Sequence, residues 1–172
     1  MKRKQIAILV GVMVLLLASG TQIVAQAAGN KDKDKEKMSF KAVLGGYDRV
    51  PPNSTPATGE FKAKLSRDET TLDFELSYEN LTGLPTDLHL QFGQIYVNGG
   101  VIAHLCHENP CPNSTSGVVT GHLSASDVVG PTTEGIAVGD FASVLKAMRA
   151  GMTYINLHSV VFPGGEIRGQ VK

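Results

Sequence analysis

Hydrophobic and polar positions alternate with period two through most of the chain from Ser39 onward. The clearest examples are residues 59–67, 71–79 and 87–93, in which every second residue is apolar or nearly so. This alternation predicts β-strands with one face in the core and the other in solvent, as antiparallel sheets have. The segments between them, SRDETT and ENLTGLPT, have the composition of turns.

Further segments continue the pattern and are separated by glycine- and proline-rich stretches. They are Phe40–Leu44, Gly100–Leu105, Gly117–Leu123, Thr153–His158 and Glu166–Val171. Eight short strands with turns between them predict an all-β fold, an antiparallel β-sandwich or barrel with Greek-key-like connections.

One segment, GDFASVLKAMRAG (139–151), has a helical period instead. Its apolar residues fall at i, i+3, i+4 and i+7 from Phe141, which is the spacing of one helix face. Asp140 is suited to the N-cap and Gly151 to the position after the last turn. We expect one short helical insert that covers an open end or edge of the sheet.

The beginning of the chain has the layout of a secretory signal peptide. Basic residues at positions 2–4 precede an apolar run from Ile6 to Ser19, and the small residues of VAQAAG follow, which predicts cleavage after Ala27. The uninterrupted apolar core is shorter than the ~20 residues of a membrane span. An uncleaved anchor is the alternative, for which the hydrophobic stretch would have to reach Ala28.

This layout divides the chain into a signal peptide (1–27), a charged flexible linker (28–38) and one domain (39–172). The linker contains KDKDKEK, whose alternating charges include no apolar residue to bury. Removal of residues 1–27 leaves 13 basic and 16 acidic residues, a net charge of −3. Nucleic-acid binders usually carry a concentrated basic face, so we expect no nucleic-acid partner. We expect a secreted or cell-envelope protein with no stable membrane span after cleavage.

Four motifs occur in order along the predicted domain: AVLGGYDRVPP (42–52), ENLTG (79–83), HLQFG…VNGGV (89–101) and YINLHSVVFPGGEIRGQ (154–170). Together they resemble the CHRD domain, which is named from chordin, an extracellular antagonist of bone morphogenetic proteins, and which also occurs in many secreted microbial proteins. The segment CHENPC and the helical insert resemble a microbial subgroup. The resemblance implies an extracellular β-sandwich-like domain and no established catalytic residue.

Two positions depart from the family pattern. The family usually has an acidic residue before Val-Pro-Pro, where this chain has Arg49. It also usually has a second histidine in the central strand, where this chain has Gln91 two residues after His89.

The alternation of side chains predicts where the strand histidines point. In the segment DLHLQF the apolar residues face one way, so His89 and Gln91 face the other. In TYINLH the same argument places Asn156 and His158 on the polar face. If these two strands are neighbours, His89 and His158 can approach each other across the sheet.

Two interpretations of these histidines follow. Imidazole is a common zinc and copper ligand, so His89 and His158 are candidates for a metal site. Further histidines that could supply a third ligand are His104, His107 and His122. The other interpretation is a hydrogen-bonded polar network that fixes the register of the strands. We favour the network, because an amide such as Gln91 is a poor zinc or copper ligand.

The two cysteines, Cys106 and Cys111, lie in the pattern H-x-C-H-x3-C with His104 and His107. A metal site would combine two thiolates with two imidazoles. However, neighbouring side chains on an extended chain point to opposite sides, and exported thiols tend to oxidise. A disulfide between Cys106 and Cys111 is therefore the preferred interpretation.

The sequence provides little support for catalysis. It contains no G-x-S-x-G elbow and no glycine loop that opens a helix to hold phosphate. Glu166 and Arg168 flank Ile167 in the last predicted strand, and their spacing predicts a surface ion pair rather than an acid/base pair.

We therefore expect a secreted, non-enzymatic domain that binds an extracellular protein or matrix component and needs no cofactor. The alternative is an extracellular metal-binding protein that uses His89 and His158 to hold copper or zinc. A third possibility is a purely structural component of the envelope or matrix.

Overall fold

The computed structural model describes residues 37–106 and 111–172. The predicted signal peptide (1–27), most of the predicted linker (28–38) and His107 lie outside the described residues.

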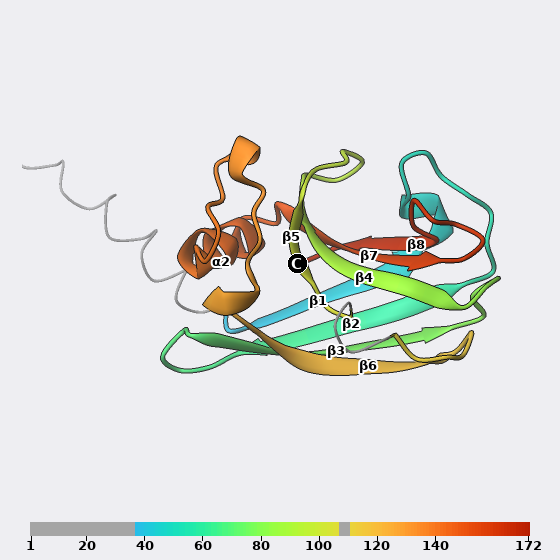
Figure 1. Ribbon diagram of the computed structural model, residues 1–172, viewed down its shortest axis with the longest axis horizontal. Coiled ribbons are helices and arrows are strands. Elements are labelled where there is room, and N and C mark those ends of the chain that lie inside the picture. Colours follow the sequence, from blue (N-terminus) through green and yellow to red (C-terminus); the bar gives the residue numbers. More distant parts are fainter. Residues whose placement is uncertain (1–36, 107–110) are drawn as a thin grey trace, which may run out of the picture.

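The described residues form eight strands, one α-helix and three short 3-10 helices (Figure 1). In chain order these are β1 (Ser39–Gly45), η1 (Gly46–Asp48), β2 (Thr58–Leu65), β3 (Thr71–Glu79), β4 (Pro85–Phe92), β5 (Val101–His104), β6 (Gly117–Ser124), η2 (Ala125–Asp127), η3 (Thr132–Glu134), α2 (Phe141–Arg149), β7 (Thr153–Ser159) and β8 (Ile167–Gln170).

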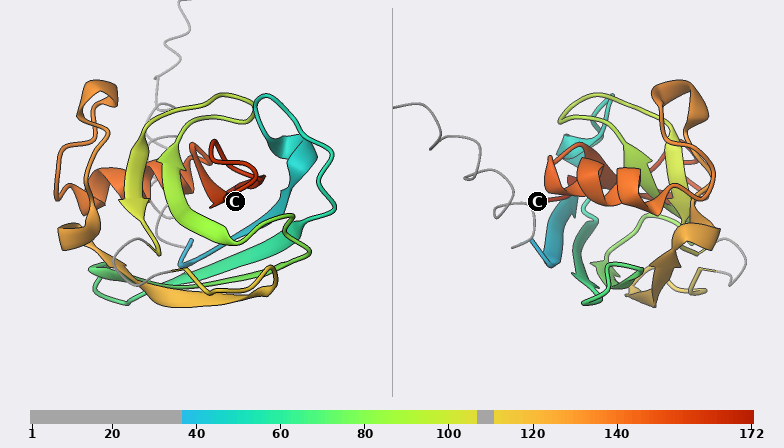
Figure 2. Two further views of the ribbon diagram at one scale, coloured as in Figure 1. Left: turned by 45° about the vertical axis from the view of Figure 1, so that its right-hand side comes forward. Right: turned by 90° about the vertical axis from the view of Figure 1, so that its left-hand side faces the viewer.

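The eight strands make one antiparallel sheet in the order β5-β4-β7-β8-β1-β2-β3-β6. The sheet curls into a nearly closed barrel, and α2 lies on the side where the edge strands β5 and β6 come round toward each other (Figure 2). Hairpins join β1 with β2, β2 with β3, β4 with β5 and β7 with β8, whereas the connections from β3 to β4, from β5 to β6 and from β6 to β7 pass from one end of the strand order toward the other. The predicted all-β antiparallel fold is confirmed, and the barrel is the architecture observed.

Period-two patterning explains the half of the barrel formed by β1, β2 and β3. In each of these strands buried residues alternate with exposed or half-exposed ones. Their inward side chains are Phe40, Ala42, Leu44, Phe61, Ala63, Leu65, Leu72, Phe74, Leu76 and Tyr78, all buried in the core. The outward side chains are mostly polar or charged, so this half has one face in solvent, as predicted.

The helix α2 begins and ends as its sequence predicts. The Asp140 side chain accepts a hydrogen bond from the backbone N–H of Ser143 (3.0 Å), which satisfies a donor of the first turn. Gly151 adopts a left-handed conformation with φ 71° directly after the last turn. The apolar stripe that starts at Phe141 is buried against the rest of the core.

The strands β7 and β8 differ from β1–β3 because they are buried on both faces. Loops 46–57 and 93–100 cover their outer side, and Arg168 of β8 holds both loops. Its Nη1 donates a hydrogen bond to the carbonyl of Asp48 (3.0 Å), and its Nη2 donates to the carbonyls of Gln94 (3.1 Å) and Val97 (3.0 Å). The guanidinium also lies over the ring of Tyr154, 3.9 Å from its centroid.

The predicted surface ion pair of Glu166 and Arg168 is wrong, because both side chains are fully buried. Glu166 instead accepts hydrogen bonds from the hydroxyl of Thr55 (2.6 Å) and from the backbone and hydroxyl of Thr82 (2.8 and 2.9 Å). Strand alternation predicts which face a residue occupies, but it does not predict that a loop covers that face.

We expect Arg168→Met to lower the free energy of unfolding by about 3–5 kcal/mol, because the carbonyls of Asp48, Gln94 and Val97 would lose their charged donor and both loops would lose their anchor on β8. Urea denaturation of the purified domain measures this. Arg67→Met, in the exposed hairpin after β2, is the matched control and should change stability by less than about 0.5 kcal/mol. An Arg168→Met midpoint equal to that of the parent protein would contradict the anchoring role.

Candidate functional sites

A row of polar side chains crosses the outer face of the loop-covered half of the barrel. His104 of β5 pairs with His89 of β4, His89 pairs with Asn156 of β7, and Asn156 pairs with Arg168 of β8. These four residues occupy successive neighbouring positions on four adjacent strands. His89, Asn156 and Arg168 are all buried, so this part of the row is a polar layer shielded from solvent, whereas His104 at the edge of the sheet is exposed.

Asn156 is the centre of one half of this layer, and each of its polar atoms is bonded. Its Nδ2 donates to Gln91 Oε1 (2.9 Å) and to His158 Nε2 (3.0 Å). Its Oδ1 accepts from Arg49 Nη1 (3.0 Å), and Arg49 Nη2 donates in turn to the carbonyl of Gly164 (2.6 Å). The hydrogen-bonded network predicted from the sequence is present here, and it includes Arg49 and Gln91.

Gly165 allows the loop after β7 to lie directly on this network. Its φ of 114° is in the region that favours glycine, and a Cβ here would clash with Asn156 Oδ1 and with the guanidinium of Arg49. The second glycine of the FPGGE motif is therefore required by both backbone conformation and close approach.

The bonds of His158 fix its tautomer. Because its Nε2 accepts from Asn156, its Nδ1 carries the proton and donates to the carbonyl of Pro163 (2.9 Å). The ring of His158 touches the ring of His89 edge to face, with centroids 4.7 Å apart. Its two nitrogens, however, are directed at the network and not at the nitrogens of His89.

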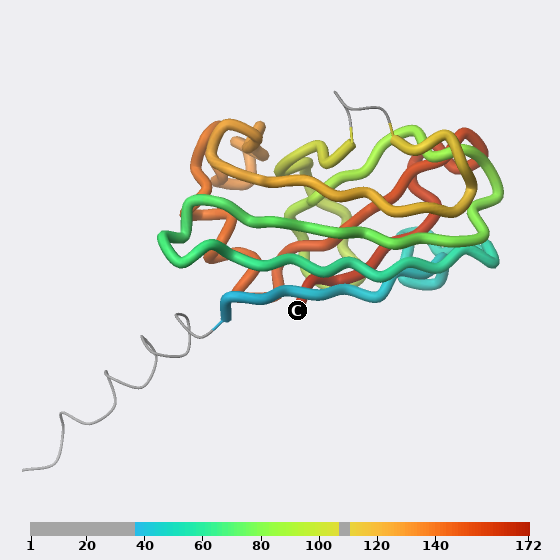
Figure 3. Tube along the Cα trace, turned by 90° about the horizontal axis from the view of Figure 1, so that it is seen from below, coloured from blue at the N-terminus to red at the C-terminus, as the bar shows by residue number. Residues whose placement is uncertain are grey.

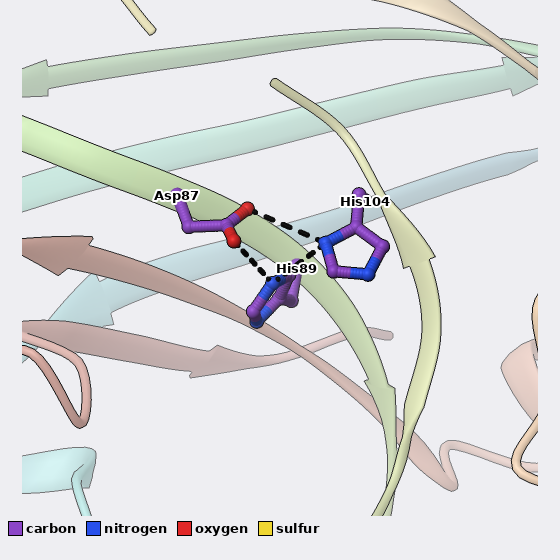
Figure 4. A group of neighbouring side chains, drawn as sticks. All are labelled: Asp87, His89 and His104. Carbon is purple, nitrogen blue, oxygen red and sulfur yellow. Dashed lines mark hydrogen bonds and ion pairs between the residues drawn. The ribbon is translucent and has the colours of Figure 1, made fainter. Parts of the chain in front are cut away.

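The other half of the layer is a group of three titratable side chains, Asp87, His89 and His104, here called the Asp–His–His group (Figure 4). Asp87 and His89 lie two residues apart on the same face of β4, and the β4–β5 pairing brings His104 opposite His89. His89 Nε2 lies 2.9 Å from Asp87 Oδ2 and 3.0 Å from His104 Nδ1. His104 Nδ1 lies 3.6 Å from Asp87 Oδ1, so the carboxylate presents one oxygen to each ring.

The surroundings of this group shift its acid–base equilibria. Burial disfavours the imidazolium and lowers the pKa of His89 to about 4, although the nearby Asp87 carboxylate acts in the opposite direction. Burial also lowers the pKa of His158. Burial acts to raise the pKa of Asp87, but its attraction to His89 and His104 outweighs this, so the pKa lies below its usual value. Near neutral pH the group therefore combines a carboxylate with a neutral buried imidazole.

The structure brings the two histidines singled out from the sequence, His89 and His158, into ring contact. It also brings His104 to His89, while His122 lies on another face beside Asp73 (2.5 Å). Asp87 was missed: it is a second polar residue on the His89 face of β4, and the i, i+2 alternation could have identified it.

A disulfide joins Cys106 and Cys111, as predicted, with their Cα atoms 5.1 Å apart. It excludes the thiolates from the alternative metal site of the H-x-C-H-x3-C pattern. The bridge begins two residues after His104, so it restrains the chain where β5 ends.

A second candidate site lies on the solvent face of β1, β2 and β3, which run side by side with β6 (Figure 3). A groove of about 750 Å³ on this face is lined by most of the lysines of the described residues. The described residues include six lysines, and the five that line the groove are Lys37, Lys41, Lys62, Lys64 and Lys172. We call these five residues the lysine face. The formal net charge of zero for the full chain, with 16 basic and 16 acidic residues, conceals this segregation.

The strand register places like charges directly next to one another on the lysine face. Lys41 pairs with Lys62 on β2, and the backbones of Lys41 and Lys172 exchange two hydrogen bonds of 2.9 Å. Three lysines therefore lie in a lateral row across roughly 10 Å, given the usual strand spacing. Asp73 and Glu75 of β3 border the row opposite Lys64 and Lys62.

The CHRD domain family matches residues 40–171, nearly all of the described structure. The chain belongs to the CHRD domain family. CHRD domains are typically extracellular binding modules. No curated protein and no solved structure is significantly similar to the chain. Among the described residues of this CHRD domain, no helix is both long and apolar enough to cross a membrane.

The geometry gives a physical reason for the closing motif of this CHRD domain. In FPGGEIRGQ, Gly165 makes room for the Asn156–Arg49 bond, Glu166 fastens the loops that contain Thr55 and Thr82, and Arg168 fastens loop 93–100. The motif is thus a set of loop anchors.

The lowered pKa of His89 predicts a loss of stability in mild acid. The pKa of this ring is about 6.5 in the unfolded chain and about 4 in the folded domain. Between these two values the unfolded chain binds a proton on the ring and the folded domain does not, so protonation favours unfolding. Stability should therefore fall as the pH decreases, by about 2 kcal/mol from His89 between pH 7 and pH 5. His158 contributes in the same direction.

Urea denaturation of chelator-treated protein at pH 7, 6 and 5 measures this loss. In His89→Gln the decrease over the same range should be clearly smaller. A parent protein whose stability is constant or increases toward pH 5 would show that the ring is not buried in its neutral form.

Proposed function

We propose that the chain is a secreted, non-enzymatic CHRD module that binds an anionic polysaccharide outside the cell through the lysine face. The observation that carries this proposal is the gathering of five of the six described lysines around one groove. The family supports a binding role, and the sequence contains no nucleophile elbow that would support hydrolysis.

Secretion is supported by the signal-peptide layout of residues 1–27 and by the disulfide of Cys106 and Cys111. Disulfides persist in oxidising compartments and are rare in the cytosol.

We expect the chain, expressed with its own N-terminus, to appear in the culture medium or cell-envelope fraction as a species that begins at Ala28. Intact-mass measurement and N-terminal sequencing determine this. Ala25→Glu/Ala27→Glu should block cleavage, because signal peptidase requires small residues at these positions. An uncleaved chain in the membrane fraction would favour the anchor alternative.

The arrangement of the lysines fits a linear polyanion. Like charges directly opposite each other destabilise a sheet, so the row of Lys172, Lys41 and Lys62 costs the isolated domain some stability. An anionic chain in the groove would remove that repulsion and release its own counterions. Glu60 forms an ion pair with Lys62 (3.1 Å), but both side chains are exposed, so the pair contributes little to stability. An anionic ligand can therefore replace Glu60 as the partner of Lys62.

Other anionic partners fit this face less well. The outward positions of β1, β2 and β3 include no aromatic side chain on which a base could stack. A flat anionic membrane would meet Asp73 and Glu75 together with the lysines, whereas a polymer one chain wide can follow the basic row alone. A polysaccharide with repeating carboxylate groups is therefore the partner that we expect.

Polygalacturonate is a suitable probe, and binding can be followed by isothermal titration calorimetry at two salt concentrations. We expect Lys41→Gln/Lys62→Gln to raise the Kd at least tenfold and to make the salt dependence shallower, because two ionic contacts are lost. Arg67→Gln/Lys146→Gln is the matched control: it removes the same charge from exposed positions elsewhere and should change the Kd less than threefold.

Neutral dextran, a DNA duplex and vesicles of anionic lipid complete the set of ligands. Equal weakening by the two double variants would mean that net charge alone attracts the polymer. Tighter binding of the duplex or of the vesicles than of polygalacturonate would show that the class of partner is wrong.

A further inference from the structure

The Asp–His–His group directs three electron-pair donors at one point (Figure 4). His89 Nε2 is close to both Asp87 (2.9 Å) and His104 Nδ1 (3.0 Å), so the two ring nitrogens face each other as well as the carboxylate. The three side chains come from neighbouring positions on β4 and β5; His89 and His104 are paired directly across these strands, and Asp87 is paired with His158 of β7. The convergence is therefore a property of rigid elements and not of a loop.

Protons alone satisfy this arrangement poorly. The two facing nitrogens cannot both carry a hydrogen at a separation of 3.0 Å, so at least one presents its lone pair. If His89 Nε2 carries the proton, it must serve both the Asp87 carboxylate and His104. A cation between the three donors would accept all of these electron pairs at once.

The spacing is close to that of a metal site. Ligands held 2.0–2.2 Å from a tetrahedral ion are about 3.3–3.6 Å apart. The separation of 3.6 Å lies at the upper end of this range, and the separations of 2.9 and 3.0 Å are shorter by about 0.3–0.4 Å, so binding an ion requires only a small outward shift of the side chains. The donors are two imidazole nitrogens and a carboxylate. Calcium and magnesium prefer all-oxygen ligand sets, whereas zinc and copper bind imidazole well.

We propose that Asp87, His89 and His104 bind one divalent transition-metal ion of the zinc–copper class. This site is independent of the lysine face, since β7 and β8 separate β4 from β1 in the sheet.

His158 takes the role of a supporting residue in this site. Its nitrogens are bonded to Asn156 and to the carbonyl of Pro163, so neither lone pair is directed at the ion. Its ring packs against that of His89 at 4.7 Å and restricts how the His89 ring can turn. The candidate ligand set is thus Asp87 and His104 with His89, in place of the His89 and His158 pair.

The test uses the mature, untagged protein with its disulfide intact. Zn²⁺ alone, titrated by calorimetry near pH 7 after chelator treatment, should bind with a stoichiometry of one, and elemental analysis after desalting should find it retained. Co²⁺ should give the intense visible absorption of a four-coordinate site with nitrogen ligands. A large excess of Ca²⁺ should not displace either ion.

The informative variants are His104→Ala and Asp87→Asn, each of which should raise the Kd for Zn²⁺ at least tenfold. The His104 side chain is one-third exposed, so its removal leaves the core intact, and thermal unfolding of the metal-free variant verifies this. The matched control is His122→Ala, which removes a histidine that also lies beside an aspartate, Asp73, but on another face. It should change the Kd less than threefold.

Three results would overturn the proposal: no stoichiometric Zn²⁺ binding, an equal loss in His122→Ala and His104→Ala, or displacement of Zn²⁺ by Ca²⁺. A visible spectrum of bound Co²⁺ that changes in His158→Gln as much as in His104→Ala would overturn the ligand assignment, because a supporting residue lowers affinity without leaving the coordination shell. Polygalacturonate binding by His104→Ala should be unchanged, so failure of this proposal and failure of the lysine-face proposal can be told apart.

Discussion

The buried guanidinium of Arg168 is the interaction on which the polar half of this barrel depends. A charged group removed from water must be compensated by hydrogen bonds, and Arg168 obtains them from the carbonyls of residues 48, 94 and 97 in two loops. Those loops thereby become the cover of β7 and β8. Without this cover, Asn156 and Tyr154 would face solvent, and water would compete for the bonds that now hold the network together.

The Asn156 network shows how Arg49 and Gln91 depend on one another. Both bond the same asparagine, at the two ends of its amide group. Arg49 supplies a donor to the Asn156 oxygen, and Gln91 supplies an acceptor for its nitrogen. An acidic residue at position 49 could not donate that bond as a carboxylate. The two side chains are therefore best understood as complementary partners in one hydrogen-bonding pattern, centred on Asn156.

Period two was sufficient to predict the strands, and it placed His89, Asn156 and His158 on the polar face, where the structure finds them. It could not predict that this face is buried, because the cover comes from loops 46–57 and 93–100, whose positions depend on contacts distant in sequence. For this reason Glu166 and Arg168 were mistaken for a surface pair. From the sequence, His104 and His122 were equally possible neighbours of His89. The strand pairing decides between them: β5 places His104 opposite His89, whereas β6 places His122 opposite Asp73.

The asymmetry of the barrel accounts for two very different kinds of site. On the loop-covered half, the buried ring of His89 meets the partly exposed Asp87 and His104, so electrostatic interactions are stronger than in water and a single small ion can be bound by three groups. On the open half, the lysines remain hydrated, so each contact is weak and screened by salt, and affinity requires a ligand that engages several of them together. The same sheet can therefore support a compact ion site and an extended polymer surface, because β7 and β8 keep the two environments apart.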